Sequence, residues 1–143
     1  PRHIAEREAR TIARLLRWPD EWLCVEELPG EYGPGNVVTI EIESEHITEV
    51  FTGFGEKGVR AEEVARRVAD EARRYLDADV PVGEHLADQL LIPLALAGGG
   101  SFRTLPLSQH ARTNIEVVKM FLQVEAVVTP VGELRWSVDL RAR

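Results

Sequence analysis

Apolar residues recur at helical spacing near the start of the chain. Between residues 4 and 16 they share one face, while arginines and glutamates fill the opposite face, which predicts an amphipathic helix. A Trp-Pro pair ends this pattern, because proline lacks the amide hydrogen that a helix needs. Residues 22–25 are then expected to form a short strand that buries Cys24. The proline- and glycine-rich residues 29–35 are expected to form a loop.

Alternation of apolar and polar residues indicates two strands before the next helix. Valine and isoleucine alternate with threonine and glutamate over residues 38–43, which is the period of a half-exposed strand. A turn at residues 44–45 leads into a second strand over residues 47–51, so the pair is expected to form a hairpin. Residues 61–76 return to helical spacing, with a buried stripe of Val64, Val68, Ala72 and Tyr75.

The pattern changes after residues 77–81, which are the expected boundary between two units. A helix is predicted over residues 84–97 and an extended segment over residues 102–107, with three glycines between them. Strands and helices therefore occur in both halves of the chain. This mixture predicts an α+β fold, in which helices pack on one side of small sheets.

A loop, a helix and a hairpin are expected to complete the chain. Thr113 and Glu116 have the spacing of a capping box, so Thr113 is the expected N-cap of a helix over residues 114–122. His110 would then lie in the loop just before the amino end of this helix. The hairpin strands are expected over residues 124–129 and 134–140, where Leu134, Trp136, Val138 and Leu140 share one face.

The composition is that of a soluble globular protein. Of the 143 residues, 44% are hydrophobic and 29% are charged, proportions that exclude a disordered chain. There are 17 lysines and arginines against 24 acidic residues, a net charge of −7. This charge argues against a general nucleic-acid coat, because such a protein needs clustered cations. It is compatible with a nucleic-acid end held in a small pocket by a few arginines.

The sequence also limits where the protein is expected to work. Cys24 is the only cysteine, so no internal disulfide can form and a reducing compartment, the cytoplasm, is expected. No apolar run approaches the roughly 20 residues of a membrane helix, so no membrane partner is expected. No signal peptide opens the chain, which begins at Pro1 with helical sequence soon after it. This start fits either a processed Met-Pro terminus or a fragment of a longer protein.

Residues 53–58 match the pattern G-x-G-x-x-G between a strand and a helix. A dinucleotide fold requires this helix to return to a parallel strand that ends in an acidic residue. Here the following element is another helix, and the preceding strands indicate a hairpin. We therefore expect a glycine-rich connection from sheet to helix, with no dinucleotide bound to it.

The segment over residues 83–100 combines polar residues with an almost wholly apolar turn. On a helix, His85, Asp88, Gln89 and Ile92 fall on one side. An apolar surface on every side implies burial, so the polar residues are expected at the edge of a pocket. The alternative is a core helix that ends at the glycines and has no site.

His110 has a chemical context if a helix begins shortly after it. The amino end of a helix has free amide hydrogens and a positive partial charge, both of which attract phosphate oxygens. An imidazole beside such a site can attack a phosphorus atom. The alternative is an incidental loop histidine. No spacing of histidines or cysteines that is typical of a structural zinc site occurs.

These last two segments together resemble the RNA 3′-terminal phosphate cyclase family. The resemblance rests on the run Gly-Glu-His-Leu-Ala-Asp-Gln that begins at residue 83, and on Ser-Gln-His-Ala-Arg-Thr-Asn at residues 108–114. Residues 1–7, 55–58 and 121–122 are also similar to that family. The resemblance therefore spans essentially the whole chain.

Membership in the catalytic branch of this family implies an activity. Its members use ATP to convert an RNA 3′-phosphate into a 2′,3′-cyclic phosphate, through AMP held on a histidine. By the motif match, His110 is the catalytic nucleophile. His85 corresponds to a position beside the adenine, and a divalent metal, Mg²⁺ or Mn²⁺, would neutralise the triphosphate. The expected lining of the ATP site is the run His85, Leu86, Ala87, Asp88 and Gln89, with Asp88 near the phosphates.

Members of the family are much longer than this chain. On their template, residues 1–80 resemble most of a smaller inserted domain, and residues 81–143 resemble the last repeat of a larger domain of repeated α+β units. The implied partners are the RNA 3′-phosphate end, ATP and the missing amino-terminal portion of the same enzyme. The alternative is a non-catalytic relative that binds RNA or assists ribosome assembly. Such relatives lack the histidine that is present here as His110.

Overall fold

The structure of the protein is a computed structural model that describes residues 2–30 and 35–143. Most of the loop expected over residues 29–35 lies outside the described residues. Within the described ranges, no helix is long and apolar enough to cross a membrane.

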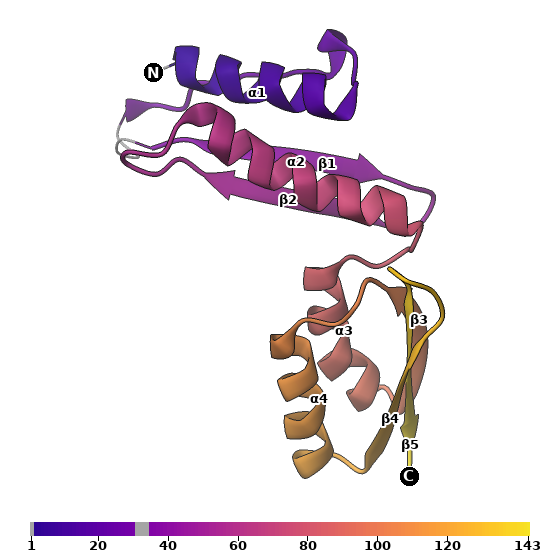
Figure 1. The fold of residues 1–143 in the computed structure, drawn as a ribbon. Helices are drawn as coiled ribbons and strands as arrows, with labels where there is room; N and C mark the ends of the chain where they lie inside the picture. The colour runs from indigo at the N-terminus through magenta and orange to yellow at the C-terminus, as the bar shows by residue number, and fades with distance from the viewer. Residues whose placement is uncertain (1, 31–34) are drawn as a thin grey trace. The chain divides into compact units, whose positions relative to one another are not determined.

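The chain folds as two compact units (Figure 1). The division falls just before the boundary expected at residues 77–81, and the tip of the hairpin belongs with the second unit. The first unit comprises Pro1–Ser44 and Val50–Arg74, and the second comprises Glu45–Glu49 and Tyr75–Arg143.

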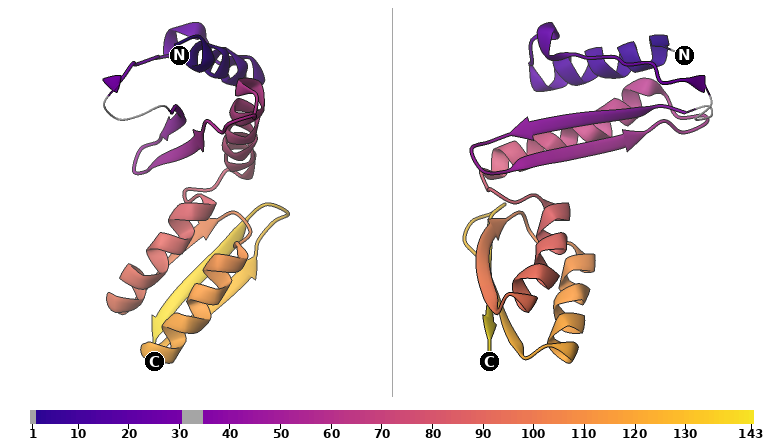
Figure 2. Two further views of the ribbon diagram at one scale, coloured as in Figure 1. Left: turned by 90° about the vertical axis from the view of Figure 1, so that its left-hand side faces the viewer. Right: turned by 180° about the vertical axis from the view of Figure 1, so that it is seen from behind.

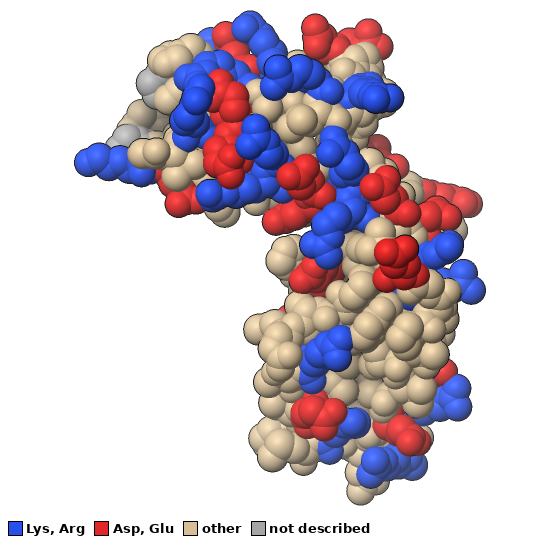
Figure 3. Space-filling model, viewed as in Figure 1, with Lys and Arg blue, Asp and Glu red and all other residues tan. Residues whose placement is uncertain are grey.

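The first unit combines two helices with a two-stranded hairpin. Its elements are α1 (Arg2–Leu16), the 3₁₀ turn η1 (Asp20–Trp22), β1 (Val37–Glu43), β2 (Thr48–Phe54) and α2 (Ala61–Ala78), of which the ends of β2 and α2 reach into the second unit. The strands run antiparallel and α2 lies along one face of them (Figures 1 and 2). The predicted stripe on α2 is buried, which confirms it: Val64, Val68, Ala72 and Tyr75. Acidic and basic side chains are interleaved over α1 and α2 (Figure 3).

Residues 22–25 do not form the expected strand, and Cys24 is exposed rather than buried. A strand requires a hydrogen-bonded partner, and nothing in the described part of the chain pairs with this segment. Instead, the amide of Leu23 donates to the Asp20 carbonyl at 3.0 Å and closes the η1 turn. The local apolar pattern predicted a strand, but no neighbouring strand in the described residues forms hydrogen bonds with this segment.

A glycine in β2 lets α2 lie close to the hairpin. A β-carbon at Gly53 would overlap the Val68 side chain and would come within 3.2 Å of Val64 Cγ1. Gly53 opens the G-x-G-x-x-G motif of residues 53–58, so the first glycine of that motif has a packing reason. The strands before α2 form the expected hairpin and the next element is a helix. The described residues around the motif therefore do not form the parallel crossover of a dinucleotide fold.

The second unit packs two helices on one face of a three-stranded sheet (Figures 1 and 2). Its elements are α3 (Glu84–Leu96), β3 (Gly99–Thr104), α4 (Gln109–Phe121), β4 (Val124–Pro130) and β5 (Trp136–Ala142). The strand order is β3-β5-β4, and both pairs are antiparallel. β3 and β4 therefore run parallel on either side of β5, with α4 as the crossover between them. Both units place helices on small sheets, so the predicted α+β fold is confirmed.

Two of the three glycines after α3 belong to β3, although the extended segment was expected only from residue 102. Gly99 pairs with Arg141 of β5 and has a φ of 137°. A β-carbon at Gly99 would lie 2.6 Å from the Leu140 carbonyl oxygen. Only glycine combines this backbone conformation with such a close approach.

The core of the second unit lies between its helices and the sheet. The buried cluster consists of Val82, Ala87, Leu91, Leu107, Ala111, Ile115, Val138 and Leu140, and Trp136 packs against it. Leu134, expected on the same face, precedes β5 and is 38% exposed. The amide of Val131 donates to the Arg135 carbonyl at 2.8 Å, which holds Leu134 inside the turn. The expectation for Leu134 was therefore wrong.

Helix α4 begins at Gln109, five residues earlier than expected. Ser108 is its N-cap and accepts the Ala111 amide hydrogen at 3.1 Å. Thr113 lies inside the helix and donates its hydroxyl hydrogen to the Gln109 carbonyl at 2.9 Å, so the capping-box prediction was wrong. His110 therefore lies in the first turn of α4 and not in a loop. The residues of α4 that are buried recur at helical spacing from this first turn, which explains the early start: Ala111, Ile115 and Val118.

Candidate active site

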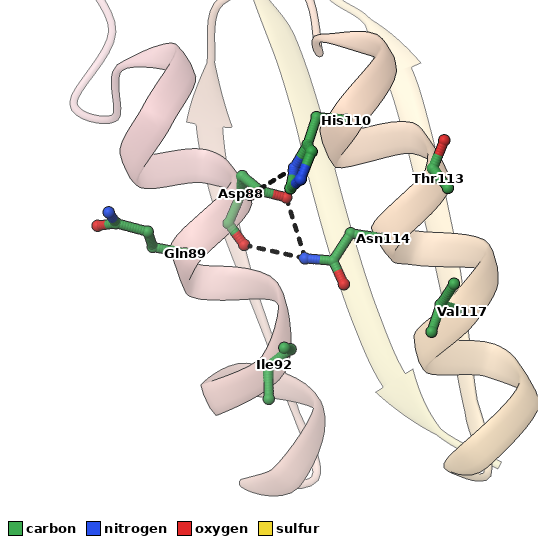
Figure 4. A pocket seen from close by; sticks show the side chains of 7 residues that line it. All are labelled: Asp88, Gln89, Ile92, His110, Thr113, Asn114 and Val117. Carbon is green, nitrogen blue, oxygen red and sulfur yellow. Dashed lines mark hydrogen bonds and ion pairs between the residues drawn. The ribbon is translucent and has the colours of Figure 1, made fainter.

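An open pocket of about 460 Å³ lies between α3 and α4 (Figure 4). Asp88 and His110, which are 22 positions apart, face it together. Asp88 was expected near the phosphates that His110 would attack, and the two side chains do share this cleft. The lining residues are Asp88, Gln89 and Ile92 from α3, and His110, Thr113, Asn114 and Val117 from α4.

The packing of the two helices determines which side chains reach the pocket. On α3, every fourth residue is buried against the sheet: Ala87, Leu91 and Ala95. Asp88 and Ile92 each follow a buried residue by one position and lie at the edge that faces α4. On α4, His110 and Asn114 each precede a buried residue by one position and lie at the edge that faces α3. The helical period alone thus brings the polar residues of the two helices together.

Among the residues that the structure describes, the His110 imidazole is anchored at one nitrogen only. Its Nδ1 lies 2.8 Å from Asp88 Oδ2. The His110 side chain is 82% exposed, whereas that of Asp88 is 22% exposed, so the ring projects outward from a carboxylate held by the protein. Because a carboxylate only accepts hydrogen bonds, Nδ1 carries the hydrogen and the neutral ring keeps its lone pair on Nε2. Nε2 is then available as a nucleophile or a base.

Asn114 holds the other oxygen of Asp88. Its Nδ2 donates to Asp88 Oδ1 at 3.0 Å and also approaches the Asp88 carbonyl oxygen at 3.5 Å. The two carboxylate oxygens are therefore divided, one to Asn114 and one to His110 (Figure 4). The sequence interpretation missed Asn114, because a helix that starts at residue 114 places it in the first turn with no partner. Once the helix starts at Gln109, His110 and Asn114 are four residues apart and share a face.

The amino end of α4 lies beside the imidazole. Ser108 is the N-cap and Gln109 is the first residue of the helix, so His110 is its second residue. The first turn of a helix carries unpaired amide hydrogens and a positive partial charge, which together favour bound anions. An anion at this end of the pocket would lie next to His110. A helix amino end was expected near His110, and the structure has one there. Its N-cap is Ser108 and not the expected Thr113.

The other residues expected at the site lie in different surroundings. Gln89 lines the pocket, but His85 is exposed on α3 and is not among the lining residues. Ala87 is fully buried in the core cluster, and Leu86 packs against that cluster. Leu86 and Ala87 could contact a ligand only through their backbone. The roles of these residues in nucleotide binding stay predictions.

The pocket lining lacks the positive charge that a phosphate-rich ligand needs. Asp88 is acidic, and none of the seven lining residues is a lysine or an arginine. Across residues 2–30 and 35–143, no group of three or more histidine, cysteine, aspartate or glutamate side chains could hold a metal ion. A polyphosphate bound here would therefore need cations from outside the pocket.

Comparison with known proteins connects this site with one family. Residues 1–77 match the family described as RNA 3′-terminal phosphate cyclase (RTC), insert domain. The chain is 48% identical to a curated protein of Ectopseudomonas mendocina named RNA 3′-terminal phosphate cyclase, over 141 residues that make up 99% of this chain and 41% of that protein.

Two further relatives carry the same name. The protein from Pseudomonas fluorescens is 50% identical over 142 residues, which cover 99% of this chain and 42% of the relative. The protein from Salmonella typhimurium is 51% identical over 124 residues, which cover 87% of this chain and 36% of the relative. The chain thus spans about two fifths of the length of the curated relatives that it matches most fully.

Proposed function

This chain belongs to the RNA 3′-terminal phosphate cyclase family and corresponds to the carboxy-terminal portion of its relatives, and on that basis we propose that it carries the nucleophile of an ATP-dependent cyclase. The whole protein converts an RNA 3′-terminal phosphate to a 2′,3′-cyclic phosphate. In this proposal, residues 1–80 form most of the inserted domain and residues 81–143 form the last repeat of the catalytic domain. The observation that carries the proposal is the contact between His110 Nδ1 and Asp88 Oδ2.

The first step uses the free nitrogen of His110. Nε2 attacks the α-phosphorus of the substrate ATP, a nitrogen–phosphorus bond forms, and the bond to the β-phosphate breaks so that pyrophosphate leaves with its electron pair. The ring gains positive charge in this step. Asp88 accepts a hydrogen bond from Nδ1 throughout this step, and its negative charge stabilises the positive charge of the ring. His110 then holds AMP as a phosphoramidate.

The later steps return His110 to its starting state. An oxygen of the RNA 3′-phosphate attacks the phosphorus of the bound AMP, and Nε2 leaves with its electron pair. The neighbouring 2′-hydroxyl then attacks the RNA phosphorus, loses its proton and expels AMP. The products are AMP and the cyclic phosphate. His110 takes part in the first two transfers, and the ring is again available for ATP.

The residues present fit part of the substrate. The amino end of α4 suits the phosphate that reacts with His110, and Gln89 can donate or accept one hydrogen bond at the same pocket. The remaining phosphate charge needs cations from the rest of the protein, because the pocket lining has none. Mg²⁺ or Mn²⁺ supplies counter-charge to ATP in this proposal. The described residues do not form a metal site, and none of the steps above involves the ion.

The alternative is a non-catalytic, cyclase-like protein that binds RNA or assists ribosome assembly. Such a protein has no use for a nucleophile. The chain has His110, and Asp88 and Asn114 orient it. The site therefore favours the catalytic proposal.

Covalent labelling tests the proposal. The full-length protein that contains this chain is incubated with ATP labelled at the α-phosphate and with Mg²⁺ or Mn²⁺. We expect a labelled protein that survives alkali and loses its label in acid, since a histidine phosphoramidate behaves in this way and an acyl phosphate does not. His110→Ala and His110→Asn should abolish the label. Asp88→Ala should slow labelling by about 10- to 100-fold.

A matched control is available on the surface. His46 is exposed, and its ring approaches the carboxylate of the neighbouring Glu45 at 3.7 Å, so His46→Ala should label at the normal rate. Undiminished labelling of the His110→Ala protein would contradict the proposal. Label on another residue would preserve the family and remove His110 from the role of nucleophile.

A further inference from the structure

A second concave site lies in the first unit, on the surface of α1. It is a shallow groove of about 280 Å³. Four of its lining residues come from α1 and one comes from α2: Arg7, Arg10, Thr11, Arg14 and Glu62. Three of the five are arginines, in a chain whose net charge is −7. The positive charge at this groove is therefore local and is not a property of the whole surface.

One arginine of the groove is already neutralised. Arg7 makes a bidentate pair with Glu62, with Nε–Oε1 at 2.9 Å and Nη2–Oε2 at 2.8 Å. The Arg7 side chain holds the pKa of Glu62 below its usual 4.5, so the carboxylate keeps its charge at neutral pH. This pair joins α1 to α2 and forms one wall of the groove. It leaves little charge from Arg7 for a ligand.

The other two arginines keep their charge for a ligand. Arg10 approaches Glu6 only at 3.6 Å, and its side chain is 72% exposed. Within the described residues, Arg14 has no ion pair in the structure. The buried residues of α1 that do not line the groove, Glu8, Ile12 and Ala13, pack into the first unit, so the helix is held with its arginines on the exposed side. Arg10 and Arg14 therefore form a pair of exposed guanidinium groups four residues apart on one helix.

The spacing of this pair indicates the kind of anion. Residues four apart on a helix lie about 6 Å apart along its axis, which is comparable to the spacing of neighbouring phosphates on a nucleic-acid strand. Planar guanidinium groups match phosphate oxygens in geometry and charge. The groove lining has no apolar or aromatic side chain, so it has no surface that would hold a hydrophobic peptide. The charge and the spacing of these guanidinium groups suit a phosphodiester backbone.

We infer that the groove of Arg10 and Arg14 is a secondary binding site for the phosphodiester backbone of RNA, separate from the pocket of His110. The inference rests on the proposed function, because that function makes RNA the anionic polymer that the protein meets. Contacts with the backbone carry affinity without sequence preference. The groove therefore strengthens binding of the RNA strand and takes no part in the chemistry at its 3′ end.

Binding and labelling of the full-length protein, measured side by side, test this inference. The probe is a fluorescein-labelled 20-nucleotide RNA with either a 3′-phosphate or a 3′-hydroxyl, followed by anisotropy at several salt concentrations. Arg10→Glu/Arg14→Glu should raise the Kd about tenfold or more for both RNAs. It should also lower the slope of log Kd against log salt by about 1.4, since each lost contact with a single strand accounts for about 0.7. Labelling of His110 by ATP should be unchanged.

Controls separate the groove from general charge effects. Arg103→Glu/Arg135→Glu makes the same change of charge at exposed positions of the second unit and should leave the Kd within about twofold. If the charge reversals disturb α1, as judged by circular dichroism, Arg10→Gln/Arg14→Gln replaces them in the binding measurement. A polyglutamate peptide is titrated as the competing kind of ligand.

Each outcome decides a different claim. An unchanged Kd for RNA with normal labelling of His110 overturns the groove inference and leaves the proposed function in place. A raised Kd in a protein that never labels supports the groove and removes the proposed function. Binding of polyglutamate that depends on Arg10 and Arg14, without an effect on RNA, also overturns the inference.

Discussion

At the scale of single residues, Asp88 is the centre of the site because its two oxygens have different tasks. Oδ2 meets His110 and Oδ1 meets Asn114. A carboxylate held at one oxygen cannot rotate freely, so the other oxygen stays directed at the imidazole. Asn114 is thus a positioning residue that acts on His110 through Asp88.

Removal of Asn114 should loosen this arrangement. Asn114→Ala frees Asp88 Oδ1, and we expect covalent labelling of the full-length protein to slow about tenfold. The ¹⁵N NMR signals of the His110 ring should also move from a single tautomer toward a mixture. Thr113→Ala is the matched control, because Thr113 lines the same pocket and its hydroxyl donates to the Gln109 carbonyl and not to Asp88 or His110. A normal rate and an unchanged ring spectrum in Asn114→Ala would refute the positioning role.

Glu8 is a second residue with an unusual setting. It is almost fully buried on α1, its Oε2 accepts a hydrogen bond from Asn36 at 2.6 Å, and its Oε1 has no partner among the described residues. Burial raises the pKa of Glu8 above its usual 4.5. The folded protein therefore holds this proton more tightly than the unfolded chain does.

This difference predicts how stability depends on pH. The contribution of Glu8 to stability is fully present below about pH 4.5 and is lost as the pH rises through the raised pKa. Glu8→Gln removes the titration, so thermal unfolding at pH 7 should occur at a higher temperature than in the unaltered protein, and the difference should shrink at pH 4. Glu71→Gln, an exposed position of α2, should show neither effect. A lower unfolding temperature for Glu8→Gln at pH 7 would show that the charged form is the stabilising one.

At the scale of elements, the contact between α2 and the hairpin depends on a missing side chain. Gly53 of β2 faces Val64 and Val68 of α2 with no space for a β-carbon. The apolar stripe of α2 needs this approach, because that stripe is the buried face of the helix. The first glycine of residues 53–58 is thus required by helix packing.

Gly53→Ala should destabilise the protein by about 1–3 kcal/mol, since the added methyl group forces Val68 to move. Shortening the opposing residue should compensate, so Gly53→Ala/Val68→Ala should lose less than the sum of its two single changes. Chemical denaturation of the isolated chain measures these differences. Gly30→Ala is the control, because a β-carbon at Gly30 meets nothing within 4 Å. Strict additivity of the two changes would contradict the close contact.

At the scale of the whole molecule, the chain holds the proposed nucleophile, His110, in a pocket that no lysine or arginine lines. The pocket between α3 and α4 is open to solvent and is lined by no cationic residue. The chain spans about two fifths of the length of its fuller relatives. The groups that bind the triphosphate are therefore expected in the remaining three fifths.

The isolated 143-residue chain should consequently label poorly with ATP. We expect its rate to fall at least about 100-fold below that of the full-length protein, because ATP is neither held nor neutralised without those cations. The two proteins are compared at equal concentration, with His110→Ala in the isolated chain as the background. Comparable rates would show that the pocket described here is complete by itself.

The sequence alone determined the features that depend on neighbours along the chain. Helical spacing predicted α1, α2 and α3, and alternation predicted the hairpins, since both periods are properties of a short segment. The polar run around Asp88 and the motif around His110 indicated one shared site. Cys24 and residues 22–25 were misjudged, because an apolar run does not reveal whether a partner strand exists.

Only the tertiary structure decided how α4 begins and what it carries. Local spacing predicted Thr113 as the N-cap, whereas the structure uses Ser108. Burial of Ala111 in the core of the second unit requires the helix to start earlier, at Gln109, with Ser108 as its N-cap. That choice places Asn114 four residues after His110 and within reach of Asp88 on another helix. Such contacts join residues that are distant in the chain, so a pattern of neighbouring residues could not reveal them.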